Sequence, residues 1–343
     1  MKTYRVAFIG CGRIASLHAE GYKASPLCKV VALTDVKTDS AKAFAEKHGF
    51  CDAEIFTDYK TMLRKVRPDI VSICLWTGLH AQVVKDCARA KVPAIHCEKP
   101  MAPTWKDALS MVKAVEKAGT RLTFNHQRRK LPVFRKAREL VEEGAIGQLL
   151  RIEAFNPKNI LDWGTHVVDM TFKLNGDKPA ARILGQIDAR EGGAWFGIPF
   201  EQAAIGWLTF ANGVTAVIQS GDQKEMNLGF RLHGTEGDIE ILETEPHLRI
   251  RAKGRSTWQV LKVKGNLHDA KNEQMQAIMK DITDGLSKGR KMEISARHAL
   301  RATEVIYAWF ESALTRQTIE FPLKPTGTSY ATVAKAAGIR PKK

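Results

Sequence analysis

The sequence predicts an α/β protein with two domains: a doubly wound parallel sheet, then an α+β domain with an open, mostly antiparallel sheet. The chain of 343 residues is long enough for about two domains of ordinary size. Short apolar runs alternate with amphipathic helical patterns in the first third, which is typical of a parallel sheet covered on both faces. Strand-like patterns separated by turn residues dominate the second half, which is typical of antiparallel pairing.

The first domain is expected over residues 1–124. Its candidate strands are short, continuous apolar runs: Arg5–Gly10, Lys29–Asp35, Asp69–Leu75, Pro93–Glu98 and Arg121–Phe124. The helical patterns between them are Ile14–Ala24, Ser40–His48, Leu79–Ala90 and Trp105–Ala118. Strands that alternate with helices in this way predict parallel neighbours joined by helical crossovers.

The second domain is expected over residues 125–323, followed by a basic C-terminal tail at 324–343. It starts with a helix over Pro132–Glu143, a strand over Gly147–Asn156 and a helix that begins near Asp162. The strand patterns that follow are Arg182–Ala189, Ala203–Ala211, Val214–Ser220, Asn227–His233, Asp238–Leu242, Leu248–Ala252 and Trp258–Val263. Two helical patterns close the domain, Ala270–Leu286 and Ala296–Thr315.

Composition excludes several classes of protein. Hydrophobic residues at 44% and charged residues at 26% are ordinary globular values, which argues against disorder. The six cysteines include no C-x-x-C pair, which favours a reducing compartment and argues against a metal site. The uncharged stretch Gln202–Gly221 is interrupted by Asn212-Gly213, so it indicates a buried β-hairpin rather than a membrane span. We therefore expect a cytoplasmic protein without a membrane segment.

The net charge of +16 is concentrated in two places, Arg128–Arg138 and the tail from Lys324. Such basic stretches attract anions: a dinucleotide, an acidic or phosphorylated substrate, or nucleic acid. The alternative is a solvated helix face and a mobile tail, which is the commoner origin of charge runs. Phe134 is the single aromatic residue in the first stretch, which argues against a base-stacking platform and makes nucleic acid an unfavoured partner.

A glycine-rich turn, Gly10-Cys11-Gly12-Arg13-Ile14-Ala15, follows the first predicted strand. In this G-x-G-x-x-A pattern the first glycine permits a tight turn, the second admits a pyrophosphate, and the next helix presents its N-terminus to the anion. Asp35 ends the next strand, where a carboxylate accepts the ribose hydroxyls of NAD and repels the 2′-phosphate of NADP. The predicted contacts are Gly10, Gly12, Arg13, Ile14 and Asp35. NAD is therefore favoured over NADP, although Lys37 lies nearby.

Two further patterns carry candidate chemistry. Glu98-Lys99-Pro100 follows a predicted strand, so Lys99 is either a donor to a substrate oxygen or an ordinary surface lysine. In Asp162-x-x-x-His166-x-x-Asp169, a helix would place two carboxylates and an imidazole on one face, and a carboxylate would orient the imidazole as a base. A surface His-Asp pair is the alternative. Gly164 at this helix start suggests close approach by another group.

Taken together, these three motifs resemble the glucose-fructose oxidoreductase / inositol dehydrogenase (Gfo/Idh/MocA) family, and the likeness extends over most of the chain. The resemblance implies an N-terminal Rossmann domain, a cis peptide between Lys99 and Pro100, and a C-terminal sheet that mediates a homo-oligomer. It implies Lys99, Asp162 and His166 as catalytic residues. Further expected contacts are His80, Glu98 and Lys99 for the cofactor, and Lys99, Arg128, Asn156, Lys158, Asp162 and His166 for the substrate. Trp76 is also expected near the cofactor, although Leu75-Trp76 departs from the usual Thr-Pro of the family, and it either stacks near the adenosine or fills space.

The resulting hypothesis is an NAD-dependent oxidoreductase that acts on a secondary alcohol of a sugar, polyol or sugar derivative. His166, oriented by Asp162, takes the hydroxyl proton, and Lys99 polarises the oxygen. One alternative keeps the fold but changes the reaction to NAD-dependent glycoside cleavage by transient oxidation and elimination. A minor alternative is a redox-sensing or nucleic-acid-binding protein without enzymatic activity.

Overall fold

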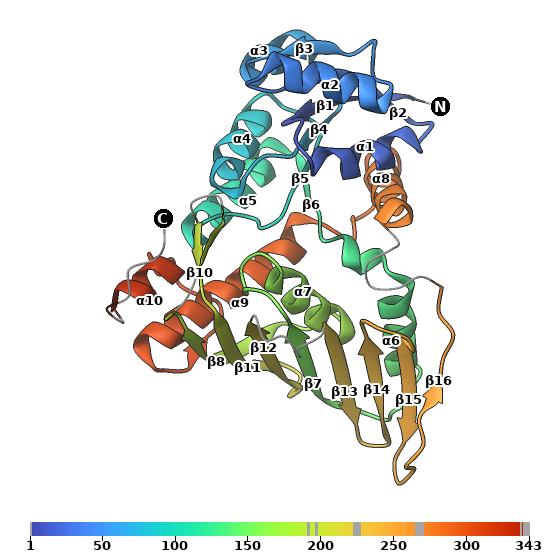
Figure 1. Cartoon of the computed structure of the whole chain (residues 1–343), viewed down its shortest axis with the longest axis vertical. Helices are drawn as coiled ribbons and strands as arrows, with labels where there is room; N and C mark the ends of the chain where they lie inside the picture. The colour runs from blue at the N-terminus through green and yellow to red at the C-terminus, as the bar shows by residue number, and fades with distance from the viewer. Residues whose placement is uncertain are drawn as a thin grey trace. The chain divides into compact units, whose positions relative to one another are not determined.

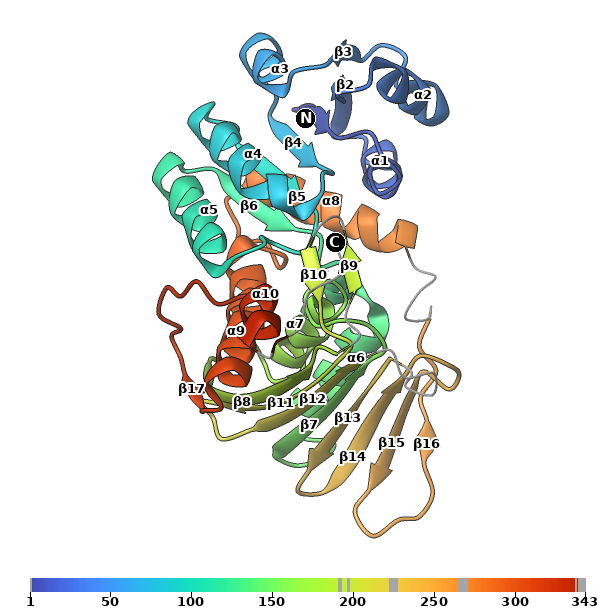
Figure 2. The same cartoon turned by 60° about the vertical axis from the view of Figure 1, so that its left-hand side comes forward.

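The computed structural model describes residues 2–190, 193–195, 198–221, 228–264, 271–336 and 338, and the chain divides into two compact units (Figures 1 and 2). The first unit comprises Met1–Pro103, Asp107–Gln127 and Lys271–Leu300. The second comprises Thr104–Lys106, Arg128–Ala270 and Arg301–Lys343. Asn227, Ala270 and the end of the predicted tail lie outside the described residues.

The first unit is built on a six-stranded parallel sheet with the strand order β3-β2-β1-β4-β5-β6. The strands are β1 (Tyr4–Ile9), β2 (Cys28–Thr34), β3 (Glu54–Phe56), β4 (Ile70–Ile73), β5 (Ala94–Cys97) and β6 (Arg121–Phe124). The predicted doubly wound parallel sheet is confirmed. The strand order reverses between β1 and β4, and ligands of such sheets bind outside the carboxyl ends at this switch point.

Helices α1 (Ala15–Lys23), α2 (Thr38–His48), α3 (Tyr59–Val66), α4 (Thr77–Arg89) and α5 (Trp105–Ala118) connect these strands. The sequence analysis missed β3 and α3. β3 is a three-residue strand with one buried side chain, Phe56, so it carries no apolar run to recognise. The helix start was marked by Asp58, whose carboxylate caps α3 by accepting from the backbone N–H groups of Lys60 and Thr61.

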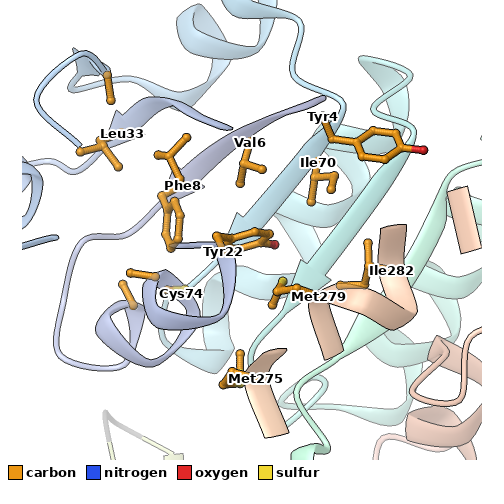
Figure 3. Close-up of a cluster of buried hydrophobic side chains, with 14 of the residues drawn as sticks. Tyr4, Val6, Phe8, Tyr22, Leu33, Ile70, Cys74, Met275, Met279 and Ile282 are labelled. Atoms are coloured by element: carbon orange, nitrogen blue, oxygen red, sulfur yellow. The ribbon is translucent and has the colours of Figure 1, made fainter. Parts of the chain in front are cut away.

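Helix α8 (Lys271–Lys288) belongs to the first unit, whereas the predicted boundary placed it in the second domain. Met275, Met279 and Ile282 of α8 join the apolar core formed by β1, β4 and α1 (Figure 3). The two helices pack closely, because a Cβ atom at Gly21 of α1 would lie 3.0 Å from the Cβ of Met275. The first unit is therefore assembled from segments about 250 positions apart.

The second unit contains a nine-stranded sheet with the order β16-β15-β14-β13-β7-β12-β11-β8-β17. Its strands are β7 (Leu149–Asn156), β8 (Ala180–Asp188), β11 (Ala203–Phe210), β12 (Thr215–Gly221), β13 (Gly229–Gly234), β14 (Gly237–Leu242), β15 (Leu248–Ala252), β16 (Gln259–Val260) and β17 (Ile319–Glu320). All neighbours are antiparallel except β7 and β12. The open, mostly antiparallel sheet is confirmed, as is the hairpin at Asn212-Gly213. Strands β9 (Gly193–Trp195) and β10 (Ile198–Phe200) form a separate pair.

Helices α6 (Pro132–Glu142), α7 (Gly164–Leu174) and α9 (Ala296–Thr315) lie on one face of this sheet (Figure 2). Trp309 of α9 packs directly over Gly185 and Gly206, where any larger side chain would collide with the indole. A further helix, α10 (Tyr330–Ala336), lies within the predicted tail, and its buried Tyr330 packs against Phe310. This part of the tail is folded, which corrects the expectation of a mobile segment. Among the helices of the described ranges, none has the length and apolar character needed to cross a bilayer.

Candidate active site

The glycine-rich turn of the first unit has the shape that a dinucleotide requires. Gly10 has a φ of 91°, and a Cβ atom there would lie 2.6 Å from the carbonyl oxygen of Cys74, so no other residue fits. A Cβ atom at Gly12 would meet nothing within 4 Å, so the backbone there borders open space. Helix α1 begins directly afterwards at Ala15. The open backbone and the helix N-terminus fit a pyrophosphate group.

Asp35 is held beside this turn by two backbone contacts. Its Oδ2 accepts a hydrogen bond of 3.0 Å from the N–H of Cys11, and its Oδ1 accepts one of 2.9 Å from the N–H of Lys37. Each carboxylate oxygen keeps further acceptor capacity, so the group suits a pair of ribose hydroxyls. Arg13 and Ile14 flank the turn with exposed side chains.

Trp76 and His80, both expected near the cofactor, differ in exposure. Trp76 precedes α4 and is 46% exposed. His80 is buried, with Nδ1 3.0 Å from the carbonyl oxygen of Pro100 and Nε2 3.0 Å from that of Leu75. Its ring therefore links the segment after β4 to the segment after β5. The Lys99-Pro100 peptide is cis, which confirms the expectation from the resemblance.

Lys99 follows a buried polar cluster whose centre is the carboxylate of Glu98. Glu98 Oε1 lies 2.7 Å from His18 Nε2 and accepts a 2.6 Å hydrogen bond from Asn125 Nδ2. Its Oε2 accepts from the backbone N–H of Lys99 at 3.1 Å. His18 Nδ1 in turn lies 2.7 Å from Ser72 Oγ. Glu98 is thus engaged with protein groups and supports the backbone of Lys99.

The electrostatics of this cluster favour an ion pair. Burial by itself lowers the pKa of His18, but Cys74 and Glu98 outweigh it and raise the pKa to about 10. Burial opposes ionisation of Glu98, yet His18 holds the pKa of that carboxyl below its usual value. The neighbouring ring of His96, 4.6 Å from His18, has its pKa lowered by burial and by the charge on His18. His18 is therefore the imidazolium and His96 the neutral ring.

Sequence reasoning missed His18 and Asn125. The available signal was the placement of His18 on the apolar face of α1, one turn from the buried residues Ala15 and Tyr22. A polar residue on a buried face requires a partner, but the sequence does not reveal which one.

In the second unit the pattern from Asp162 to Asp169 is divided between a turn and a helix. Helix α7 begins at Gly164, so Asp162 precedes it and the predicted shared helical face is not formed by all three residues. The backbone N–H of Asp162 donates to Asn159 Oδ1 at 2.8 Å, and its side chain is half-buried. His166 is buried in the first turn of α7. Gly164 permits the predicted close approach, because a Cβ atom there would lie 3.2 Å from the Cβ of Ile160.

Asp169 contacts Arg129, which the sequence pattern did not foresee. Arg129 Nε lies 2.9 and 2.8 Å from the two carboxylate oxygens of Asp169, and Arg129 Nη2 donates to Asp177 Oδ1 at 2.7 Å. Arg301 Nη2 completes the group with a 2.9 Å bond to Asp177 Oδ1. We call these four residues the Arg129 cluster. It ties α7 to the turn η1 (Gln127–Lys130).

Asn156 and Lys158 lie at the end of β7. Asn156 is buried, and its Nδ2 donates to the carbonyl oxygen of Lys158 at 2.7 Å and to Ser220 Oγ at 3.0 Å. Asn156 thus holds the turn in shape, whereas the side chain of Lys158 is exposed. The same turn is held by Glu201, missed from the sequence, whose buried carboxyl accepts from the N–H of Ile160. Burial raises the pKa of Glu201 to about 7.

The basic strip Arg128–Arg138 is divided between a buried turn and a helix. The interpretation as a solvated helix face holds for Arg135 on α6 but is wrong for the turn. Arg128 and Arg129 are both buried. The guanidinium carbon of Arg128 lies 5.1 Å from the ring centre of Trp163. Further along, Arg138 pairs with Glu142 and Lys136 with Glu139. Arg129, Lys136 and Arg138 of the strip thus have acidic partners within the protein.

A parallel sheet of this order with a glycine turn at its switch point defines the class of Rossmann-fold, dinucleotide-binding proteins. The comparisons with known proteins narrow the class. Residues 4–126 match the family model described as an oxidoreductase family with an NAD-binding Rossmann fold. Residues 134–240 match the GFO/IDH/MocA C-terminal domain. The chain belongs to the Gfo/Idh/MocA family of oxidoreductases, as the three sequence motifs indicated.

Individual relatives agree with this assignment. The chain is 30% identical over 267 residues to the uncharacterized oxidoreductase YrbE of Bacillus subtilis, covering 69% of this chain and 73% of that protein. It is 34% identical over 155 residues to myo-inositol 2-dehydrogenase of Thermotoga maritima, covering 45% and 46% of the two chains. Levoglucosan dehydrogenase, solved with NADH and levoglucosan, has a TM-score of 0.81 at 20% identity and covers 94% of this chain and 100% of its own. At that identity the structural likeness shows the shared fold.

Proposed function

We propose that the chain is an NAD-dependent dehydrogenase that oxidises a secondary alcohol of a sugar, polyol or sugar derivative. The observation that carries the proposal is Lys99, whose backbone is held by the buried His18–Glu98 pair at the end of β5. The names of the relatives support the substrate class: myo-inositol 2-dehydrogenase, D-glucoside 3-dehydrogenase of Escherichia coli, and levoglucosan dehydrogenase.

Each residue has a proposed role in the reaction. When bound, NAD supplies the chemistry of hydride acceptance. His166 takes the proton of the substrate hydroxyl, and Asp162 orients the imidazole and stabilises its charged form. The Lys99 ammonium donates to the same oxygen as it becomes a carbonyl. Lys99 belongs to the first unit and His166 to the second.

The central test is Lys99→Met, which removes the ammonium and keeps the length of the side chain. We expect turnover to fall by at least about a hundredfold, because a donor to the reacting oxygen is lost. NADH binding, followed by its fluorescence, should stay within a few-fold of wild type. Lys117→Met on the exposed face of α5 is the matched control. Unchanged turnover of a sugar panel with Lys99→Met would refute the role.

NAD rather than NADP is proposed as the cofactor because the Asp35 carboxylate is held beside the glycine turn. Asp35→Ser should weaken NAD binding about tenfold to a hundredfold, since hydrogen bonds to a charged group contribute roughly 1.5–3 kcal/mol. The same variant should narrow the gap between NAD and NADP in kcat/KM. An unchanged preference for NAD would contradict the role of Asp35. Net formation of NADH during turnover distinguishes dehydrogenation from the glycoside-cleaving alternative.

A second copy of the chain is the proposed partner of the open sheet face. Leu184, Ile205 and Trp207, on neighbouring strands β8 and β11, are 47%, 50% and 48% exposed. An apolar cluster of this kind on a sheet face marks an interaction surface. Trp207→Glu should reduce the size of the particle in light scattering, and an unchanged mass would contradict the proposal.

A further inference from the structure

We propose that Arg128, together with Trp163, forms a subsite for an anionic group of the substrate, so that the preferred substrate is a sugar or polyol carrying a carboxylate or a phosphate. This inference rests on the proposed dehydrogenase function and specifies its substrate class.

Arg128 is a buried cation that no acidic residue of the described ranges contacts. The exposed fraction of Arg128 is 7%. Among the described residues, none has a carboxylate oxygen within ion-pair distance of the guanidinium, and none accepts a hydrogen bond from it. A guanidinium has five N–H donors. Those of Arg128 are not completely enclosed by the described residues, so a ligand that supplies acceptor oxygens can engage them.

The nearest described acid, Glu243, does not fill this role. Its charge acts on Arg128 over a distance, partly offsetting the effect of burial, which lowers the pKa of Arg128 to about 10. Its Oε2 is occupied by a 2.9 Å hydrogen bond from the backbone N–H of Leu228. The charge of Glu243 therefore favours the protonated form of Arg128, but Glu243 accepts no hydrogen bond from the guanidinium. Arg128 stays protonated at neutral pH, as a site for an anion requires.

Trp163 gives the guanidinium a fixed plane. The guanidinium carbon lies 5.1 Å from the ring centre, a distance typical of a cation–π contact. An arginine stacked on an aromatic face keeps the N–H groups at its edge available for a bidentate contact with carboxylate or phosphate oxygens. The stack thus orients the donors without consuming them.

The place of Trp163 in the chain connects this subsite with the chemistry. Trp163 lies between Asp162 and Gly164, the first residue of α7, and His166 follows in the first turn of that helix. Arg128, Trp163, Asp162 and His166 all belong to the second unit. An anionic group held at Arg128 would therefore belong to a molecule that also lies beside the segment carrying the proposed base.

The experiment compares matched neutral and anionic substrates with NAD: glucose with glucuronate, and glucose with glucose 6-phosphate. For wild type we expect kcat/KM to be at least about tenfold higher for one anionic member than for glucose. Arg128→Met should lose that advantage, so that its kcat/KM for the anionic substrate falls to about its own value for glucose. Arg128→Lys should keep part of the advantage for both anions, because lysine keeps the positive charge but cannot make the bidentate contact.

Arg135→Met on the exposed side of α6 is the matched control, since it removes one positive charge from the same strip. It should leave the preference for anions unchanged. Equal kcat/KM values for the neutral and anionic substrates in wild type, or an anion preference that survives in Arg128→Met, would overturn the subsite.

A binding measurement separates failure of the subsite from failure of the proposed function. Inorganic phosphate and glucuronate are titrated against wild type and Arg128→Met, with the rise of Tm as readout. Saturable stabilisation of wild type alone supports the subsite even if no sugar yields NADH. Oxidation of neutral sugars combined with identical titrations of the two proteins refutes the subsite and keeps the dehydrogenase.

Discussion

Arg128 and Arg129 are neighbours in one turn and are both buried, yet their surroundings are opposite. The guanidinium of Arg129 is surrounded by the carboxylates of Asp169 and Asp177, and its side chain is 1% exposed. The guanidinium of Arg128 rests on the ring of Trp163 and contacts no described carboxylate. A buried charge that the protein itself pairs holds the fold together, whereas a buried charge without an acid partner is available to a ligand.

The largest expected effect concerns Arg129, the arginine that is paired with carboxylates. Asp169→Asn leaves Arg129 with one of its two carboxylates and should lower the free energy of unfolding by about 3–5 kcal/mol, as is typical when one partner of a buried pair is removed. Urea titration measures this loss, with the exposed Asp52→Asn as control. A loss below about 1 kcal/mol would show that the Arg129 cluster does not anchor α7.

The second-largest effect concerns Glu201, a buried acid. No neighbouring cation contributes to the shift of its pKa. Its pKa is about 7 in the folded protein, against 4.5 ordinarily, and burial is the cause. Below about pH 4.5 both folded and unfolded states hold the proton. As the pH rises to about 7, the unfolded chain ionises first, so the protein loses stability, on the order of 3 kcal/mol in total.

Glu201→Gln removes this dependence, because the amide does not ionise and can still accept from the N–H of Ile160. The variant should therefore be more stable than wild type near pH 8, and the difference should shrink toward pH 5. Thermal unfolding of both proteins across this range measures the effect. Parallel curves of Tm against pH would contradict the raised pKa.

The smallest expected effect concerns Arg128, the arginine that contacts no carboxylate of the described residues. Arg128→Met should change the free energy of unfolding by less than about 1 kcal/mol, because no ion pair is broken and the apolar stem is kept. The same urea titration used for Asp169→Asn gives a direct ranking of the two sites. A loss as large as that of Asp169→Asn would give Arg128 an internal structural role and remove the distinction between the two arginines.

The candidate site was predicted from sequence to different extents in the two units. In the first unit, the glycine turn, Asp35 and Lys99 each come directly after a strand that is a continuous apolar run. The local hydrophobic pattern therefore predicts their positions at the carboxyl ends of the parallel strands. In the second, the spacing of Asp162, His166 and Asp169 suggested one helical face, but α7 starts after Asp162. A spacing pattern locates the end of a helix only to within one or two residues, and Asp162 lies just outside this one.

The parallel sheet, the glycine turn and the motifs that identify the family could all be predicted from the amino-acid sequence, because each depends on residues that are close together in the chain. Only the folded chain shows that α8 completes the first unit and that Asp177 accepts from both Arg129 and Arg301. The guanidinium of Arg128, by contrast, lies over the ring of Trp163. Asp177 lies 48 and 124 positions from Arg129 and Arg301 in the chain. Whether a charge is buried, and which group neutralises it, depends on such distant segments meeting, and no local pattern records that.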